Sequence, residues 1–459
     1  MKQITAVTGQ AGTGKTTWLM EKANELAPAL LTAEHHSMLA ITRMHGSRRR
    51  VQTKLRKCCP SIPGVVSTID GFALSIVNRW RTALGYTRPI CAVDGDVDFV
   101  NSAFGTNADF ARVLRAAIQL LESPTVKRVI SESFPLILID EFQDCWGPLL
   151  DFVKALAECS TLLLAADDFQ MLNSEVLGCP AIEWVESLTF EGRARIETLD
   201  TCHRTSNTAI LHAAECIRTN RKSDDKTVSV VSCPNPKMAA WKIVDALLLK
   251  FYMKDWYGNC AIIFPSKDNY IRNVMDSCSA YAQKYNRPPL TFHKEISHAQ
   301  HVQLVLKDIG FEDKRAQCIY TCDTSNPTGH QVIEGVRKQI KLRGLSDVTE
   351  EIVVSYAERI VHHHRSYSPK EGKRVIVTVH GAKNREFDNV IVLWPYRVRE
   401  ELKKRLLYNA ITRARKHCMV LLQLKEKEAK SDSAISLLGP LEPFKDDSKR
   451  KKQGAKVQK

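Results

Sequence analysis

Short apolar runs separated by amphipathic stretches recur along the chain and predict alternating strands and helices. Residues 4–7, 136–139 and 161–166 are predominantly apolar, and NCAIIF at 259–264 and RVIVTVH at 374–380 repeat the pattern later in the chain. Such runs lack the polar–apolar alternation of a half-exposed strand and are typical of parallel strands buried on both faces. The pattern therefore predicts an α/β fold built on parallel sheets.

Length and composition narrow the class of protein. With 459 residues, the chain is too long for one hydrophobic core and long enough for two domains with insertions or a tail. Its 44% hydrophobic and 25% charged residues are ordinary for a globular protein, and no apolar run approaches the roughly 18 residues of a membrane span. The 14 cysteines are scattered without paired CxxC motifs. We therefore expect reduced cytoplasmic thiols and no metal held by protein ligands alone.

The net charge of +15 indicates a polyanionic partner, most simply a nucleic acid. Part of this charge lies in the terminal segment 445–459, which has few apolar residues and is expected to be a disordered, solubilising tail. The cluster TRMHGSRRRVQTKLRK at 42–57 instead falls within the predicted folded region. It is either a solvated helix face or a surface that contacts a nucleic-acid backbone.

The first candidate site is a phosphate-binding loop. The segment GQAGTGKT matches G-x-x-x-x-G-K-[ST], follows a strand-like run and precedes a helix-like one. Its glycines allow backbone N–H groups to face phosphate oxygens, Lys15 can reach the outer phosphates, and the Thr16 hydroxyl can bind Mg²⁺. The expected nucleotide-binding residues are Gly9, Gln10, Ala11, Gly12, Thr13, Gly14, Lys15, Thr16 and Thr17.

Acidic residues follow two further predicted strands. Asp140 and Glu141 come directly after the apolar run at 136–139, and TLLLAADDFQ ends in Asp167, Asp168 and Gln170. Ligands bind at the carboxyl ends of parallel strands in open α/β sheets. We therefore expect Asp140 to hold Mg²⁺ with Thr16, and Glu141 to polarise the water that attacks the terminal phosphate.

These segments stand in the order found in UvrD/Rep-like superfamily 1 helicases, which the chain resembles along most of its length. IDEFQD is similar to the hydrolytic motif, AADDFQ to the segment whose glutamine senses the terminal phosphate, and LDTCHRTSNTAIL to the motif whose arginine reaches the γ-phosphate. VTVHGAKNREFDNVIVL resembles T-x-H-x-x-K-G-x-E-F-D, and RLLYNAITRAR resembles the motif of the arginine finger. The resemblance implies catalytic roles for Glu141, Gln170, Arg204 and Arg413, and a nucleotide contact by Glu386.

The same resemblance implies the residues that contact nucleic acid. AITRMHGSRRRVQTKL and STIDGF are similar to two DNA-contacting segments of the family, although Arg43 stands where Asn is usual and Asp70 where His is common. Asn384 likewise replaces a glycine. The expected nucleic-acid-binding residues are Thr42, Arg43, Thr68, Phe72, Thr378 and His380. For Phe72, a core position is the alternative, because aromatic side chains are more often buried than used to stack bases.

The resemblance implies a P-loop NTPase with two RecA-like parallel-sheet motor domains, each with a mainly helical insertion. The expected boundaries are 1–80 and 127–200 for the first motor domain, 81–126 for its small insertion, 201–268 and 371–425 for the second motor domain, 269–370 for its insertion, and 426–459 for a basic C-terminal tail.

The expected function is an ATP-dependent DNA helicase that couples hydrolysis to movement on single-stranded DNA and to duplex unwinding, with 3′ to 5′ direction implied by the resemblance alone. Two alternatives are a translocase or protein-displacing motor without robust unwinding, and an ATP-gated nucleic-acid clamp. The expected cofactors are ATP and Mg²⁺. The expected partners are single-stranded or tailed duplex DNA, with RNA left open, and proteins of a repair, replication or defence complex. No membrane partner is expected, and the protein would be cytoplasmic or associated with a nucleoid or nucleus.

Overall fold

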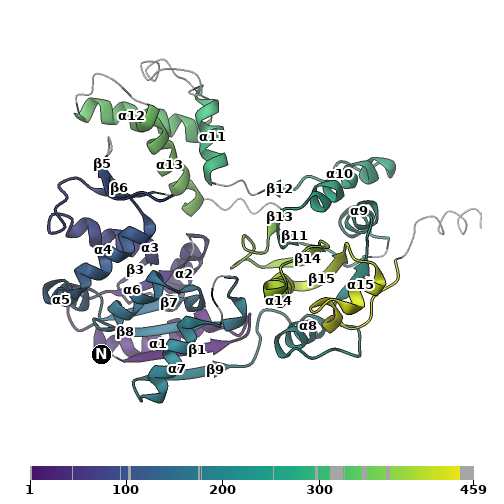
Figure 1. Cartoon of the computed structure of the whole chain (residues 1–459), viewed down its shortest axis with the longest axis horizontal. Helices are drawn as coiled ribbons and strands as arrows, with labels where there is room; N and C mark the ends of the chain where they lie inside the picture. Colours follow the sequence, from purple (N-terminus) through teal and green to yellow (C-terminus); the bar gives the residue numbers. More distant parts are fainter. Residues whose placement is uncertain are drawn as a thin grey trace, which may run out of the picture.

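The computed structural model of the chain contains two six-stranded sheets that lie side by side, and every strand pairing within each sheet is parallel (Figure 1). The structure describes residues 3–43, 45–93, 95–101, 105–173, 176, 178–251, 253–294, 298–310, 324, 326–343, 348, 350–367 and 373–444. The two parallel sheets confirm the expected α/β class, since each has helices packed on both faces.

The first sheet contains the phosphate-binding loop. Its strand order is β3 (Gly64–Thr68), β2 (Met38–Thr42), β7 (Leu136–Asp140), β8 (Thr161–Ala166), β1 (Ile4–Gly9) and β9 (Ala194–Leu199). One face is covered by α1 (Lys15–Leu30) and α2 (His45–Cys58). The other face is covered by α3 (Ile69–Arg79), α4 (Phe110–Glu122), α5 (Pro124–Ser133), α6 (Pro148–Ala157) and α7 (Pro180–Phe190). The carboxyl ends of β1, β7 and β8 therefore meet at one edge, where the predicted site residues follow.

The second sheet has the order β10 (Ser229–Ser232), β15 (Ala414–Leu422), β14 (Phe387–Trp394), β11 (Cys260–Phe264), β13 (Arg374–Thr378) and β12 (His293–Lys294). Helices α8 (Thr208–Thr219), α14 (Lys403–Ile411) and α15 (Glu426–Ser431) pack on one face. Helices α9 (Pro236–Val244) and α10 (Asn269–Lys284) pack on the other, and α9 continues directly into the π-helical turn Asp245–Leu249. Helix α14, which packs on this second sheet, lies at the junction with the first sheet.

Two smaller units branch from the sheets. The first is a three-stranded sheet in the order β4 (Ile90–Val93), β6 (Thr106–Asp109) and β5 (Val100–Asn101). The second is a helical cluster of α11 (His298–Asp308), α12 (Pro327–Arg343) and α13 (Glu350–Tyr367), which has its own apolar core. Figure 1 shows this cluster above the first sheet, although the chain enters and leaves it from the second. Helix α13 contacts α2 of the first sheet, so the cluster bridges the two halves.

The observed packing differs from the expected boundaries in three places. Helix α4, expected in the first insertion, packs against α3 and α6 because its strongly apolar face joins their core, and the insertion itself contains strands. Helix α10, expected in the second insertion, packs on α9. Residues 426–444, expected as tail, pack on the second sheet, where Thr227 Oγ1 donates to the Leu438 carbonyl at 2.6 Å. Residues 445–459 lie outside the described residues.

Phe72 lies in the core of the first sheet, which corrects its predicted role as a nucleic-acid contact. Its side chain is 6% exposed, and its ring packs edge-on against Phe134 at 5.6 Å and tilted against Phe152 at 6.3 Å between centroids. Aromatic packing of this kind places the ring away from solvent. Helix α3 therefore turns Phe72 inward, and no face of the ring is open to a base.

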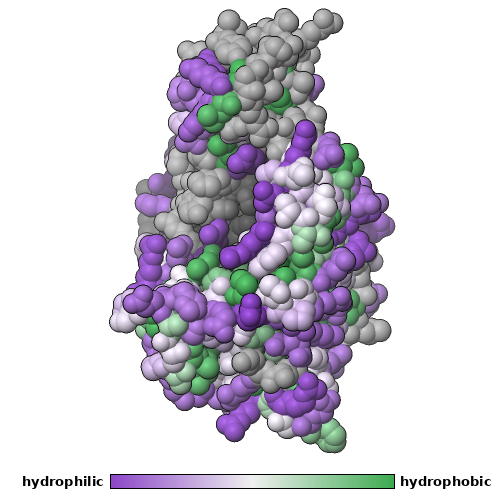
Figure 2. Space-filling view, turned by 90° about the vertical axis from the view of Figure 1, so that its left-hand side faces the viewer, coloured by the Kyte–Doolittle hydropathy of each residue, from purple (hydrophilic) through white to green (hydrophobic). Residues whose placement is uncertain are grey.

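Figure 2 shows a largely hydrophilic face on the side of the first sheet and the helical cluster, with hydrophilic side chains along one edge of a hollow. Apolar side chains on this face form only small, scattered patches. Among the described residues, no helix is both long and apolar enough to cross a membrane.

We expect Phe72→Ala to lower the free energy of unfolding by about 3–5 kcal/mol, because the substitution leaves a cavity in a closely packed core. Urea denaturation followed by circular dichroism measures the change. Phe190→Ala is the matched control, since Phe190 is 96% exposed and its loss leaves no cavity. Equal stability of the two variants, with weakened nucleic-acid binding confined to Phe72→Ala, would restore the stacking role.

Candidate nucleotide and nucleic-acid site

The predicted phosphate-binding loop connects the end of β1 to the start of α1. Gly12 and Gly14 have φ values of 87° and 89°, a left-handed backbone that strongly favours glycine. Gly12 also lies against the segment between β9 and α8, because a Cβ there would stand 2.6 Å from Cβ of Arg204 and 2.8 Å from Sγ of Cys202. The N-terminus of α1 points its free N–H groups into this loop, which is the arrangement that binds phosphate.

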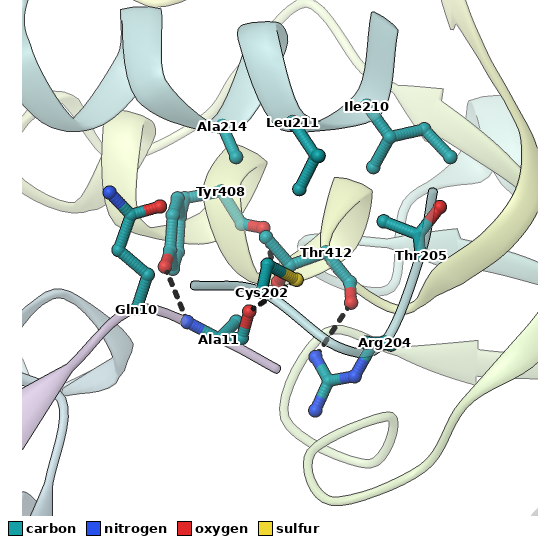
Figure 3. A pocket seen from close by; sticks show the side chains of 10 residues that line it. All are labelled: Gln10, Ala11, Cys202, Arg204, Thr205, Ile210, Leu211, Ala214, Tyr408 and Thr412. Carbon is teal, nitrogen blue, oxygen red and sulfur yellow. Dashed lines mark hydrogen bonds between the residues drawn. The ribbon is translucent and has the colours of Figure 1, made fainter. Parts of the chain in front are cut away.

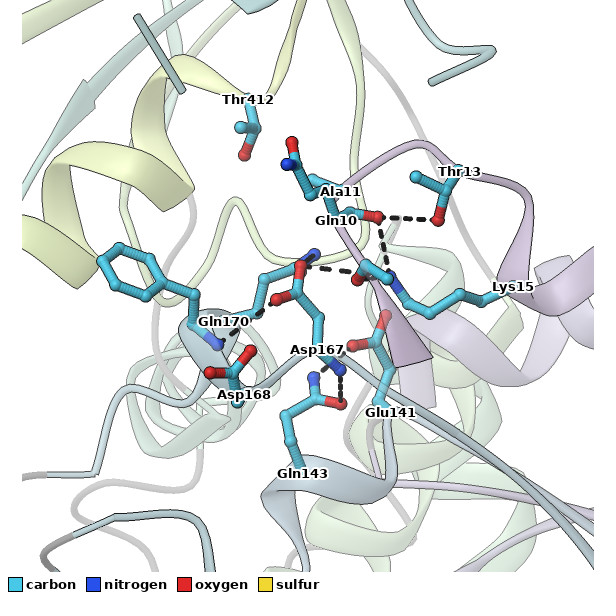
Figure 4. Close-up of polar contacts among 12 residues, drawn as sticks. Gln10, Ala11, Thr13, Lys15, Glu141, Gln143, Asp167, Asp168, Gln170 and Thr412 are labelled. Carbon is cyan, nitrogen blue, oxygen red and sulfur yellow. Dashed lines mark hydrogen bonds and ion pairs between the residues drawn. The ribbon is translucent and has the colours of Figure 1, made fainter. Parts of the chain in front are cut away.

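Lys15 folds over the loop. Its Nζ donates hydrogen bonds to the carbonyls of Gly9 at 2.7 Å and Gln10 at 2.8 Å, and lies 3.9 Å from Oδ2 of Asp167 (Figure 4). Burial lowers the pKa of Lys15, while the nearby carboxylates of Asp167, Glu141 and Asp140 oppose that change. The ammonium group is thus held in the loop between backbone oxygens and three acids, where it can meet an outer phosphate.

Thr16 and Asp140, the two residues expected to hold Mg²⁺, contact each other. The Thr16 hydroxyl donates to Oδ2 of Asp140 at 3.1 Å and lies 3.3 Å from Oδ1. A hydroxyl and a carboxylate at the edge of a phosphate loop supply the hard oxygen ligands that Mg²⁺ prefers, so these residues fit the ion. Burial raises the pKa of Asp140, and the neighbouring Glu141 carboxylate raises it further. A cation at this position would relieve both effects.

Glu141 follows Asp140 in a left-handed backbone conformation, with φ of 60°. Its Oε2 accepts a hydrogen bond from Nε2 of Gln143 at 2.6 Å, which fixes the orientation of the carboxylate. Burial favours the neutral acid, but the charges of Lys383 and Arg50 outweigh that effect and hold the pKa of Glu141 below its usual value. A charged, oriented carboxylate beside the metal-binding pair is suited to polarising water.

Gln170 joins the first sheet to an arginine of the second. Its Nε2 donates to Oδ2 of Asp167 at 2.8 Å, and its Oε1 accepts from Nη2 of Arg413 at 3.3 Å. Arg413 is only 1% exposed, and its Nε donates to the carbonyl of Asn409 at 3.0 Å. Burial lowers the pKa of Arg413 to about 9, with the nearby Arg204 charge adding to the effect. The arginine is therefore a desolvated cation aimed at the first sheet.

Arg204 and Glu386 pair at the opposite side of the loop. Nε of Arg204 donates to Oε1 of Glu386 at 2.8 Å, and Nη1 donates to the carbonyl of Thr412 at 2.8 Å (Figure 3). Glu386 also accepts from Nη2 of Arg415 at 2.7 Å. Burial would raise the pKa of Glu386, but the two arginines lower it to about 2. The expected nucleotide contact Glu386 thus anchors Arg204 beside Gly12.

Several residues of this junction escaped the sequence analysis. The hydroxyl of Tyr408 accepts from the backbone N–H of Ala11 at 3.0 Å and donates to Oδ2 of Asp167 at 3.3 Å. Lys383 Nζ pairs with Asp144 at 2.6 Å, so the second sheet also contacts the hydrolytic segment of the first. The signal was present, because Tyr408 and Lys383 lie within motifs that carried the resemblance, but the spacing of a motif does not reveal which side chains cross a junction.

A pocket lies where these segments meet. Figure 3 shows that it is lined from the phosphate loop, from the segment around Arg204, from α8 and from α14. Its lining residues are Gln10, Ala11, Cys202, Arg204, Thr205, Ile210, Leu211, Ala214, Tyr408 and Thr412. A single pocket thus draws on both halves of the chain.

The remaining predicted nucleic-acid contacts are dispersed. Thr42 is fully buried at the end of β2, and Thr68 caps α3 by accepting the N–H of Gly71 at 3.0 Å. Thr378 accepts the N–H of Gly381 at 3.2 Å, and His380 is exposed. In the observed conformation, His380 is thus the best placed of these four side chains to contact a strand of nucleic acid.

The two departures from the family pattern on the first sheet face each other. Nη1 of Arg43 donates to Oδ2 of Asp70 at 2.9 Å. Burial raises the pKa of Asp70, whereas Arg43 opposes that change. The opposite charges of Arg43 and Asp70 therefore compensate each other, and the Arg43 guanidinium already forms an ion pair within the protein.

Comparison with known families supports the resemblance. The profile of the UvrD/REP helicase N-terminal domain matches residues 99–174, and that of the UvrD-like helicase C-terminal domain matches residues 374–421. One match falls in each half of the chain, and together they confirm the likeness to UvrD/Rep-like helicases. Comparison with curated proteins finds no match.

Among solved structures, the chain is similar to arterivirus nonstructural protein 10, a helicase, in a complex with DNA and in a crystal structure of the same protein. Both share 13% identity and a TM-score of 0.31 with this chain and cover 91% of it. The chain spans 60% and 59% of their respective lengths.

The arginines around Glu386 make stability depend on pH. Because the folded-state pKa of Glu386, about 2, lies below its ordinary value, this carboxylate stabilises the fold above the ordinary pKa and loses that contribution as the pH falls toward about 2. We expect wild type to exceed Glu386→Gln in free energy of unfolding by on the order of 2 kcal/mol near neutral pH, and the gap to shrink in acid. Urea denaturation at a series of pH values measures it. A gap that stays constant from neutral pH into acid contradicts the ion-pair account.

Proposed function

We propose that the protein is an ATP-driven motor that moves along single-stranded nucleic acid, with DNA as the first substrate to test. One observation supports this proposal above the others: Arg204, in the segment between β9 and α8, and Arg413, directly before β15, converge on the phosphate-binding loop and Gln170. An NTPase that only binds nucleotide has no need of cations delivered from another domain. A motor needs such cations, because hydrolysis then depends on closure of the junction between the two domains.

Residues from both parts of the junction would contribute to ATP hydrolysis. Lys15 and the loop amides would hold the outer phosphates, and Thr16 with Asp140 would hold Mg²⁺, which neutralises phosphate charge when bound. Glu141 would orient the attacking water and accept its proton. Gln170 is positioned to report the state of the terminal phosphate to Arg413, since it already contacts that arginine. Arg204 and Arg413 would stabilise the negative charge that develops on the transferred phosphoryl group.

Coupling to a strand would run through contacts that cross the junction. Lys383 reaches Asp144 of the hydrolytic segment and lies three residues from the exposed His380. A strand held at His380 would therefore be connected to the hydrolytic carboxylates through a short loop. The net charge of +15 for the whole chain favours a polyanionic partner.

We expect single-stranded DNA to stimulate ATP hydrolysis, and Glu141→Gln to lower kcat at least about 100-fold, because the amide cannot accept a proton from water. Steady-state phosphate release measures both effects. Glu158→Gln, an exposed change at the end of α6, serves as control and keeps wild-type turnover. Steady turnover that persists in Glu141→Gln would overturn the catalytic assignment, and absence of turnover in wild type would favour a clamp that only binds.

Strand displacement separates a helicase from a translocase. We expect duplexes with a 3′ single-stranded tail to be unwound in the presence of ATP and Mg²⁺, and those with a 5′ tail to be unwound much more slowly. The control is the Glu141→Gln protein, which binds the tailed duplex without displacing the strand. Unwinding from the 5′ tail alone would reverse the proposed polarity, and stimulated hydrolysis without displacement would identify a translocase. Matched RNA oligomers at several salt concentrations test the choice of nucleic acid.

A further inference from the structure

Asp167 is a fully buried acid beside the phosphate-binding loop, at the end of β8. Its Oδ2 accepts hydrogen bonds from Nε2 of Gln170 at 2.8 Å and from the hydroxyl of Tyr408 at 3.3 Å, and lies 3.9 Å from Nζ of Lys15 (Figure 4). Its Oδ1 accepts the N–H of Phe169 at 3.2 Å. The amide, the hydroxyl and the backbone N–H are uncharged donors. A carboxylate buried among them also requires a nearby positive charge.

Arg218 of α8 supplies such a charge from the side of the second sheet. Its Nη1 donates to Oδ1 of Asp167 at 2.7 Å, and its Nη2 donates to Oδ1 of Asp168, so one guanidinium spans two consecutive acids. The guanidinium carbon lies 5.7 Å from the centroid of the Phe169 ring. A planar fork that makes two charge-assisted hydrogen bonds and rests on an aromatic ring has a well-defined position. Arg218 therefore fixes the carboxylate of Asp167 as well as compensating its charge.

Lys15 is the second cation near Asp167, and it has another task. Burial lowers the pKa of Lys15, and Asp167 is the strongest of the nearby charges that oppose this change. The ammonium group nevertheless lies beyond hydrogen-bond distance of Asp167 and donates to the carbonyls of Gly9 and Gln10 instead. Asp167 and a phosphate oxygen would compete for this ammonium, since both are anions. The direct hydrogen bond from Arg218 weakens the competitor.

We propose that Arg218 is a positioning residue for nucleotide binding: its hold on Asp167 leaves Lys15 available to the outer phosphates. The inference rests on the proposed function and concerns a residue outside the motifs that carried the resemblance. Its rival is a latch, in which the Arg218–Asp167 pair only holds α8 against the first sheet. The two roles differ when the charge of Asp167 is removed. Lys15 then loses its competitor, whereas a latch is broken from either side.

Binding of the Mg²⁺ complex of AMP-PNP to the full chain, measured by calorimetry, separates these roles. We expect Arg218→Gln to weaken binding roughly 10- to 100-fold, because the uncompensated Asp167 draws Lys15 away from the phosphates. Asp167→Asn should bind as tightly as wild type or more tightly, and the double variant should behave like Asp167→Asn. Arg218→Lys should recover part of the loss, because it keeps the charge without the fork. The matched control is Arg221→Gln, an exposed change just beyond α8, which should bind as wild type does.

Weakening in Asp167→Asn that equals the weakening in Arg218→Gln would identify a latch and overturn the positioning role. Wild-type binding by Arg218→Gln, or a double variant that binds more weakly than Asp167→Asn, would overturn it as well. If Arg218→Gln does not fold, Asp167→Asn decides alone: binding at least as tight as wild type supports the proposal, and weaker binding refutes it. A wild-type protein that binds no AMP-PNP would instead overturn the proposed function, which separates that failure from failure of the Arg218 assignment.

Discussion

The junction between the two sheets depends on one electrostatic constraint: acids buried on the first sheet require cations, and the second half of the chain supplies several of them. Asp167 is fully buried, and it accepts hydrogen bonds from Arg218 of α8 and Tyr408 of α14, two helices that pack on the second sheet. Asp144 pairs with Lys383 in the same way. Removing one partner from such a buried pair is costly, because the other charge is left without compensation. The two sheets are therefore held in their relative positions by ion pairs as well as by packing.

The same arrangement is suited to the proposed triphosphate. Arg413 and Arg204 are kept close by contacts with Gln170 and Glu386, so little reorganisation is needed when negative charge arrives. Preorganised charge in a desolvated site acts more strongly than the same groups in water. Arg413, which contacts Gln170 of the first sheet, is thus also suited to act on a phosphate. Closure of the junction and catalysis would consequently share this residue.

The sequence predicted the parts of the protein that are governed by local pattern. Continuous apolar runs indicated the parallel strands, and the glycine spacing indicated the loop in which Gly12 adopts a left-handed backbone. The sequence did not predict the features that are set by packing between segments distant in the chain. Helix α4 joined the first core through an apolar face whose partners are distant in sequence, and Phe72 was turned inward by neighbours that no motif names. The contacts that Tyr408 and Lys383 make across the junction were likewise not predicted, although both residues lie within quoted motifs, because these contacts depend on how the two sheets meet.

Hydrogen–deuterium exchange with and without Mg²⁺ and AMP-PNP tests the central claim most directly. If the first sheet binds the triphosphate and cations packed on the second sheet contact it, the nucleotide will slow exchange both in the loop at 9–17 and in α14. Exchange in the segment around Arg204 will slow as well. Protection confined to the loop would show that the second half does not engage the nucleotide, and would contradict the account.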